Sequence, residues 1–214
     1  MKRGDWKALL RMQTIALRTM HEFMHEQGFV QLMPVVLSKV TDPLGPDPGS
    51  SVIKTGEIEY YGDKLVLTQS MILHKQMALL TGVDKIYIMS PNIRLEHEKR
   101  AKTGKHLFEF SQLDFEIAHA KKEDVMGLVE DLLISIIRTV KRECKDELAM
   151  LGRKLIIPEK PFPVYTTHEL EERYGKGWEI EKSKASRQPF WALCHKREFY
   201  DKEDETRPGH YLNY

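Results

Sequence analysis

The 214-residue sequence lacks the features of secreted, zinc-binding and membrane proteins. Its two cysteines, Cys144 and Cys194, lie far apart without the paired spacing of a zinc site, so we expect reduced thiols. No apolar run is long enough to span a bilayer, and residues 1–4 lead into an amphipathic pattern rather than a signal peptide. These absences predict a cytoplasmic protein with no membrane partner.

The sequence also has little net charge. Its 33 Lys and Arg and 32 Asp and Glu give a formal charge of +1. A strongly basic nucleic-acid-binding face would normally raise this total, although a local patch is compatible with it. With 41% hydrophobic and 30% charged residues, the composition is typical of a globular enzyme, and the length predicts one compact domain over residues 1–214.

Apolar residues recur at helical spacing in two long stretches. The second stretch predicts a helix from residue 123 to about 151, which the prolines that follow would end. Thr166 and Glu169 have the spacing of a capping box and predict another short helix. The first stretch predicts a helix that Gly28 ends, with a core-facing stripe of Leu9, Met12, Ala16, Met20 and Phe23.

Strand patterns occupy the region between these helices. Residues 29–37 predict a strand interrupted by Pro34, and residues 85–89 predict another. Residues 41–56 are rich in proline and glycine, which predicts a loop. Residues 57–68 predict two strands joined by a tight turn with Gly62 and Asp63 at its centre.

An alternation of polar and apolar side chains begins at residue 106. Residues two apart on a strand share a face, and neighbours point to opposite faces. From residue 113 onward one face is apolar and suits a core, so the polar face suits either a ligand or, in the alternative interpretation, water. The polar face carries His106, Phe108, Phe110, Gln112, Asp114 and Glu116, and the other carries Leu107, Ser111, Leu113, Phe115 and Ile117.

Arg94 and Glu96 favour a ligand over water. They lie two apart after the apolar stretch 85–89, and a hairpin would place them beside the polar face of the second strand. A guanidinium, a carboxylate and the ring of Phe110 can hold a phosphate, an exocyclic amine and a purine. The segment therefore predicts a site for a purine nucleotide such as ATP.

The order Arg94-x-Glu96, a loop, and His106-Leu-x-Glu-Phe-x-x-Leu-Asp-x-Glu116 resembles motif 2 of class II aminoacyl-tRNA synthetases, in the aspartyl and asparaginyl subgroup. The resemblance implies an α+β fold, in which helices flank an antiparallel sheet. It also implies that Arg94 is catalytic and grips the α-phosphate of ATP. The other implied ATP contacts are Glu96, Arg100, His106 and Phe110, with Phe110 stacked on adenine, while Gln112 and Asp114 receive the amino acid.

The basic loop between these two parts of motif 2 would reach the β- and γ-phosphates of ATP. A solvated charged turn is an equally good interpretation for each of its basic residues. These are Lys99, Arg100, Lys102 and Lys105.

Residues 67–76 resemble the Gln-Ser-Pro-Gln-Leu-x-Lys-Gln signature of aspartyl-tRNA synthetases, with Met71 and Ile72 in place of Pro and the second Gln. The resemblance puts Lys75 on the substrate carboxylate, which favours aspartate because a buried carboxylate needs a cation. Ser70 would cap the following helix and touch the ligand. The alternative is a capped surface helix whose lysine reaches into solvent.

The helix, strand and Pro34 of the N-terminal region resemble motif 1 of the same enzymes, which builds their dimer interface. This implies a homodimer through residues 6–37. An edge position for Pro34, with no partner subunit, is the alternative. In the same enzymes the segment that corresponds to residues 41–56 closes over the amino acid, so we expect a lid there.

Residues 162–214 follow the same pattern, with Gln188-Pro-Phe-Trp191 resembling a strand of the catalytic domain. The chain ends at Tyr214, before the family's Mg²⁺-binding acidic residue and motif 3, so no metal ligands are assigned. We expect an incomplete catalytic domain, either a fragment or a truncated relative.

The family's anticodon-binding barrel has no counterpart before the first helix, so we expect no tRNA partner. A class II domain without that barrel resembles the archaeal asparagine synthetases related to asparaginyl-tRNA synthetase. This implies that ATP, Mg²⁺ and aspartate form β-aspartyl-AMP and that ammonia then gives asparagine and AMP. The alternatives are an enzyme that aminoacylates tRNA or another acceptor, and a non-catalytic paralogue.

Overall fold

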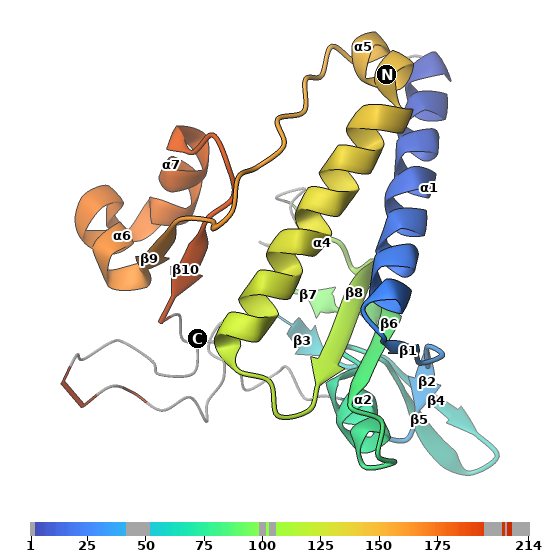
Figure 1. Ribbon diagram of the computed structural model, residues 1–214. Coiled ribbons are helices and arrows are strands. Elements are labelled where there is room, and N and C mark those ends of the chain that lie inside the picture. Colours follow the sequence, from blue (N-terminus) through green and yellow to red (C-terminus); the bar gives the residue numbers. More distant parts are fainter. Residues whose placement is uncertain are drawn as a thin grey trace. The chain divides into compact units, whose positions relative to one another are not determined.

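A computed structural model describes residues 3–41, 52–98, 102, 106–194, 203 and 205–206. These residues contain both helices and strands, and most of the strand pairs are antiparallel, as the α+β prediction requires (Figure 1). The chain divides into two compact units, one of Met24–Ala120 and one that combines Met1–Phe23 with Lys121–Tyr214. Each unit is described by itself.

The first unit, Met24–Ala120, is built around a long antiparallel hairpin. A short strand pairs in parallel with the first strand of this hairpin, which gives the order β1-β6-β8. A second sheet has the order β2-β5-β4, and β3 pairs with β7. The bounds are β1 (Val30–Gln31), β2 (Leu37–Ser38), β3 (Val52–Lys54), β4 (Glu57–Tyr60), β5 (Asp63–Leu67), α2 (Ile72–Leu79), β6 (Lys85–Ile93), β7 (Leu95–Glu96) and β8 (Glu109–Ile117).

Strand β6 is buried on both of its faces. Tyr87 on one face and Ile88 on the other are both 0% exposed. The ladder runs without interruption from Lys85 opposite Ile117 to Ile93 opposite Glu109. The predicted hairpin is therefore confirmed, and its first strand continues four residues beyond the predicted end at residue 89.

The loop predicted over residues 41–56 is wrong at its C-terminal end. Residues 52–54 form β3, which pairs with β7 in an irregular antiparallel register. Glycine and proline punctuation does not reveal a strand this short. Residues 42–51 of the predicted lid lie outside the described residues.

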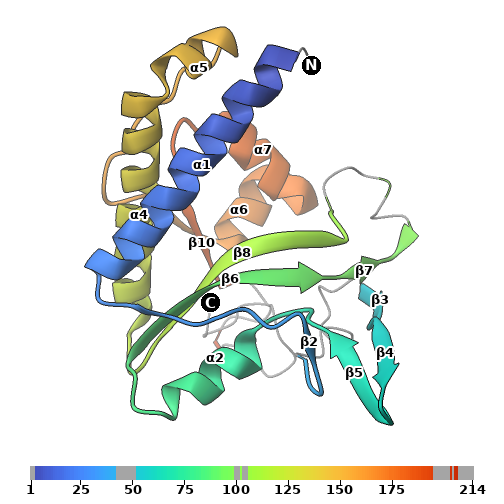
Figure 2. The ribbon, with the colours of Figure 1, turned by 90° about the vertical axis from the view of Figure 1, so that its right-hand side faces the viewer.

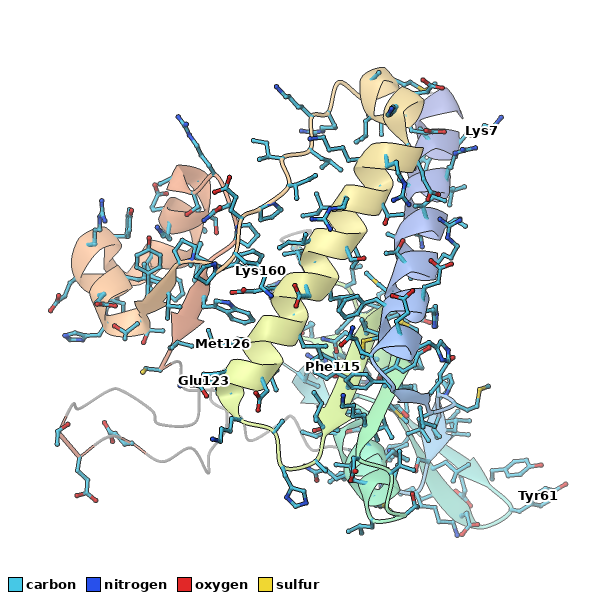
Figure 3. The ribbon with its side chains drawn as sticks, viewed as in Figure 1. Lys7, Tyr61, Phe115, Glu123, Met126 and Lys160 are labelled. Carbon is cyan, nitrogen blue, oxygen red and sulfur yellow. The ribbon has the colours of Figure 1, made fainter. Side chains whose placement is uncertain are left out.

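The β4–β5 turn lies one residue earlier than predicted. Tyr60 pairs with Asp63, so Tyr61 and Gly62 form the two-residue loop, with φ of 48° and 79°. Positive φ at both positions is the requirement of a type I′ turn, and it favours glycine, asparagine or aspartate over tyrosine. Figure 3 shows the Tyr61 side chain pointing away from the hairpin, and 90% of the residue is exposed.

The strand predicted over residues 29–37 pairs only at its two ends, as β1 and β2. Between them the Leu32 N–H donates to the Tyr87 carbonyl at 2.8 Å. Pro34 has no N–H to donate, which fits the absence of a ladder at this point.

In the second unit, residues 3–23 of α1 (Arg3–Glu26) lie beside α4 (Lys122–Glu143), as Figures 1 and 2 show. Arg18 pairs with Glu143 at 2.6 Å, and Arg11 pairs with Glu147 of α5 (Lys145–Met150) at 2.9 Å. The single helix predicted from residue 123 to about 151 is instead two helices, α4 and α5. They meet at Cys144, whose φ and ψ of −118° and 40° are not helical.

The predicted apolar stripe of α1 is partly wrong. Phe23 is buried, but Leu9 is 37% exposed, and Ala8 is buried in its place. Helix α1 ends at Glu26, and Gly28 has a φ of 79°, as a helix-terminating glycine should.

The C-terminal part of this unit contains two parallel strands, two short α-helices and one 3₁₀ helix. The capping box predicted from Thr166 and Glu169 is confirmed, because Thr166 Oγ1 accepts from the Glu169 N–H. The elements of this part are β9 (Val164–Thr166), α6 (Thr167–Tyr174), η1 (Gly175–Gly177), α7 (Trp178–Ala185) and β10 (Trp191–Leu193).

Nowhere in the described ranges is a helix both long and apolar enough to cross a membrane.

Candidate active site

The polar residues of β8 share one face of the hairpin, as the alternation predicted. Gln112 lies opposite Ser90 and Phe110 lies opposite Asn92, so the side chains of both pairs are on the same face. Asp114 lies opposite Ile88 on that face. Helix α2 contacts both strands (Figure 2), and this brings its side chains to the polar residues of β8.

Lys75 of α2 joins two of these carboxylates. It is 4% exposed, and its Nζ lies 3.1 Å from Asp114 Oδ1 and 2.9 Å from Glu116 Oε1. An ammonium group carries three donors, so one N–H direction remains beyond these two contacts. One cation and two carboxylates leave the group with a formal charge of −1. This environment attracts an ammonium group more strongly than it attracts a carboxylate.

Arg94 follows β6 and lies over the ring of Phe110. The guanidinium carbon is 5.1 Å from the ring centroid, and Nε donates to the Gln69 carbonyl at 3.1 Å. The Arg94 N–H donates to the Phe108 carbonyl at 2.8 Å, so the backbone continues beside the second strand beyond the ladder. A cation and an aromatic ring are therefore adjacent, as binding of a nucleoside phosphate requires.

Gln69 accepts the hydrogen bond from Arg94, and it lies within the signature at residues 67–76, where no role was predicted for it. It is 2% exposed, its backbone N–H donates to Thr41 Oγ1 at 3.0 Å, and its Nε2 donates to Thr55 Oγ1 at 3.0 Å. Buried Ser90 and Asn92 on β6 were also missed. The signal that could have found these two is a polar residue within an apolar strand.

The structure corrects the role predicted for Ser70 as helix cap. Helix α2 begins at Ile72, and the capping position belongs to Met71, which is fully buried. The Ser70 Oγ still accepts from the Ile72 N–H at 3.2 Å. Ser70 thus lies one residue before the cap and supports the first turn from there.

Of the other residues predicted to contact ATP, the structure describes Glu96 and His106. Glu96 lies on β7 opposite Val52, and His106 is half-buried in the segment before β8. Arg100 lies outside the described residues, as do Lys99 and Lys105. Within the described ranges, no cluster of three or more His, Cys, Asp or Glu is placed to hold a metal ion.

The chain is similar to known tRNA synthetases in sequence and in fold. The family model described as tRNA synthetases class II (D, K and N) matches residues 1–210. An aspartate–tRNA(Asp/Asn) ligase of Methanothermobacter thermautotrophicus is 31% identical over 163 residues, which are 76% of this chain and 35% of that protein. An asparagine–tRNA ligase of Koribacter versatilis is 32% identical over 177 residues, 79% of this chain and 38% of that protein. The chain thus spans well under half the length of these relatives.

The fold is similar to that of solved synthetases. The asparaginyl-tRNA synthetase of Pyrococcus horikoshii complexed with asparaginyl-adenylate has a TM-score of 0.79 at 22% identity, over 97% of this chain and 50% of that chain. An asparaginyl-tRNA synthetase of Entamoeba histolytica, also complexed with asparaginyl-adenylate, has a TM-score of 0.72 at 18% identity, over 90% of this chain and 44% of that one.

Proposed function

Because the chain belongs to the class II tRNA synthetases of the D, K and N type, we propose that it is part of a catalytic domain that activates aspartate or asparagine with ATP. An oxygen of the amino acid's carboxylate would bond to the α-phosphorus as the bond from that phosphorus to pyrophosphate breaks. The observation that carries the proposal is the placement of Arg94, Phe110 and the Lys75–Asp114–Glu116 group beside one hairpin.

In this proposal the end of the hairpin near Arg94 binds ATP. Phe110 offers a flat apolar surface to adenine, and Arg94 holds the α-phosphate, where negative charge develops during attack. Because Nε is already engaged by Gln69, the guanidinium is oriented before ATP arrives. Glu96, Arg100 and His106 complete the proposed set of nucleotide contacts. The described residues include no set of Mg²⁺ ligands, so no step is assigned to the metal.

The end near Lys75 binds the amino acid. The excess negative charge of Asp114 and Glu116 suits the substrate ammonium, and the remaining N–H direction of Lys75 suits a side-chain oxygen. Gln112 lies between this group and Phe110 along β8, where it can reach the reacting carboxylate. Ser70 is the proposed contact from the segment before α2.

The acceptor of the activated amino acid is, in our first proposal, tRNA. The relatives are named as ligases that join aspartate or asparagine to tRNA, and this gives no support to the expectation that tRNA is not a partner. The second candidate is ammonia, as in AMP-forming asparagine synthesis. One observation favours it: Lys75 is already offset by two carboxylates, so a substrate β-carboxylate gains little by staying there and is available to attack phosphorus.

We also propose a homodimer through residues 6–37. Support comes from apolar side chains of the segment around β1 that are exposed in the single chain. They are Val30 at 53%, Met33 at 76% and Val36 at 48% exposure. A second copy would cover them.

The test uses the full-length gene product with ATP and Mg²⁺. We expect exchange of labelled pyrophosphate into ATP with aspartate or asparagine and no exchange with leucine. Adding cognate tRNA should then yield aminoacyl-tRNA, whereas ammonium without tRNA yields asparagine and AMP only if the second candidate is correct. Absence of exchange with both amino acids would reject the proposal in favour of a non-catalytic paralogue.

A further inference from the structure

The buried residue Asn92 has hydrogen bonds that determine how the neighbouring amide of Gln112 is oriented. Asn92 is 0% exposed, and Ser90 beside it is also 0% exposed. Asn92 Nδ2 donates to the Ser90 carbonyl at 3.2 Å and to Gln112 Oε1 at 2.9 Å. The Ser90 hydroxyl donates to Asn92 Oδ1 at 3.4 Å.

A backbone carbonyl fixes the direction of this chain of hydrogen bonds. A carbonyl oxygen only accepts, so the end of Asn92 that faces the Ser90 carbonyl must be its NH₂ group. The second N–H of that same group points at Gln112, which must therefore present its oxygen. The NH₂ group of Gln112 is left for the other side, and Gln112 is exposed whereas Asn92 is not.

We propose that Asn92 is a positioning residue that makes Gln112 a hydrogen-bond donor toward the amino-acid substrate, where it meets an oxygen atom. This inference rests on the proposed function for the identity of the ligand. Gln112 lies directly beside Asp114 on the same face of β8, so its donor is close to the carboxylates proposed for the substrate ammonium. A donor for the substrate oxygen next to acceptors for its ammonium matches the two charged ends of an amino acid.

The orientation has an energetic reason. An amide that is free to turn over presents its oxygen as readily as its NH₂ group, and an oxygen facing a substrate carboxylate is repelled. Asn92 removes this choice without touching the ligand. It acts from a fully buried position in the hairpin, where its own rotation is blocked by Ser90.

Kinetic measurements on the full-length protein test the proposal. Asn92→Asp places a carboxylate, which only accepts hydrogen bonds, opposite Gln112, so Gln112 turns its NH₂ group inward, and Gln112→Glu removes the donor directly. We expect each variant to raise the KM for the amino acid about 10- to 100-fold, the range expected for one hydrogen bond to a charged group, and to leave the KM for ATP within about twofold. Asn92→Leu should raise the amino-acid KM only severalfold, because the amide then turns freely.

Two controls separate positioning from damage to the fold. Glu130→Gln changes another buried, hydrogen-bonded side chain, on α4, which contributes no residue to the proposed site, so both KM values should stay near those of the unmodified protein. In a Gln112→Leu background, Asn92→Asp should cause no further rise in the amino-acid KM. Equal effects on ATP and amino acid, or an Asn92 effect that persists without Gln112, would overturn the proposal.

A second measurement does not depend on catalysis. In protein labelled with ¹⁵N in its asparagine side chains, the Asn92 NH₂ signal, assigned by its loss in Asn92→Leu, should exchange slowly with solvent. Exchange should stay slow in Gln112→Glu, because a carboxylate oxygen replaces Oε1 as acceptor. Acceleration by tenfold or more would show that Gln112 had been the donor, and it would overturn the inference. This result decides the orientation even if the protein activates neither aspartate nor asparagine.

Discussion

Buried Lys75 shows how a single side chain sets the charge of the proposed amino-acid site. Its ammonium group is held by Asp114 and Glu116 and is almost inaccessible to solvent. Removing one partner of a buried ion pair leaves uncompensated charge, whereas exposed pairs contribute little. Lys39, which pairs with Asp63 at 2.9 Å with both side chains more than half exposed, is a matched control.

Lys75→Met should raise the KM for aspartate at least about tenfold, because the site loses its cation and keeps two carboxylates. The KM for ATP should change less than about twofold, since Arg94 lies outside the Lys75 contacts. Lys39→Met should change neither value. Pyrophosphate exchange measures both constants, and an unchanged aspartate KM in Lys75→Met would contradict the assignment.

The two thiols differ in burial. Cys144 is 0% exposed, and this burial, with Glu147 nearby, raises the pKa of its thiol, whereas Cys194 is half-buried. Because the thiolate is the reactive form, Cys144 should react with a disulfide reagent far more slowly than Cys194 in the native protein. Both should react quickly in guanidinium chloride. Loss of the slow phase in Cys144→Ala identifies the residue, and a slow phase that survives would refute the assignment.

At the scale of single elements, Glu130 of α4 anchors two segments at one oxygen. Its Oε1 accepts from the Phe162 N–H and from Trp191 Nε1–H, both at 2.9 Å, and Glu130 is 5% exposed. Any substitution that removes this oxygen leaves two donors without their acceptor. The contact therefore ties the chain before β9 and the start of β10 to the same helix.

Glu130→Ala should lower the free energy of unfolding by about 2–4 kcal/mol, the cost of one or two unsatisfied buried groups. Glu130→Gln keeps an oxygen at this position and should lose less than half as much. Urea unfolding followed by Trp fluorescence measures the difference. Equal losses for Ala and Gln would mean that the carboxylate charge, rather than the shared oxygen, is what matters.

The ion pair of Arg18 on α1 with Glu143 on α4 makes the stability of the protein depend on pH in the acid range. Hydrogen bonds from Arg142 and Arg18 hold the pKa of Glu143 below its usual 4.5. A carboxyl group with a lowered folded-state pKa stabilises the fold above its unfolded pKa, and this contribution is lost as the pH falls through the folded pKa. The loss is therefore expected below about pH 4.5. Glu143→Gln should flatten this acid limb of the melting temperature, and an unchanged limb would rule out this source.

Elements with strong periodicity were predictable, and those that depend on partners were not. The hairpin and its polar face followed from the alternation at residues 106–117, and the Thr166 capping box followed from its spacing. The break at Cys144 did not, because the apolar repeat continues through it. Strand β3 was missed since its three residues are held by β7 rather than by their own pattern. The roles of Gln69 and Asn92 were not predicted, because they depend on the burial of these side chains in the folded protein.

At the scale of the whole molecule, the proposed dimer can be tested by substituting residues that lie outside the proposed active site. Met33→Asp puts a charge on the exposed apolar segment, so it should shift the protein from dimer to monomer in light scattering after size-exclusion chromatography. Met77→Asp, at 63% exposure on α2, is the control and should leave the dimer intact. A dimer that survives Met33→Asp would place the interface elsewhere.

The parallel pairing of β1 with β6 has a consequence for synthesis on the ribosome. Val30 and Gln31 emerge long before Ile86 and Tyr87, the residues that complete their ladder. Helix α1 can form early from local contacts, but the strand directly after it stays unpaired until its partner has been synthesised. Chaperones that recognise extended hydrophobic segments would meet the nascent protein at this stage.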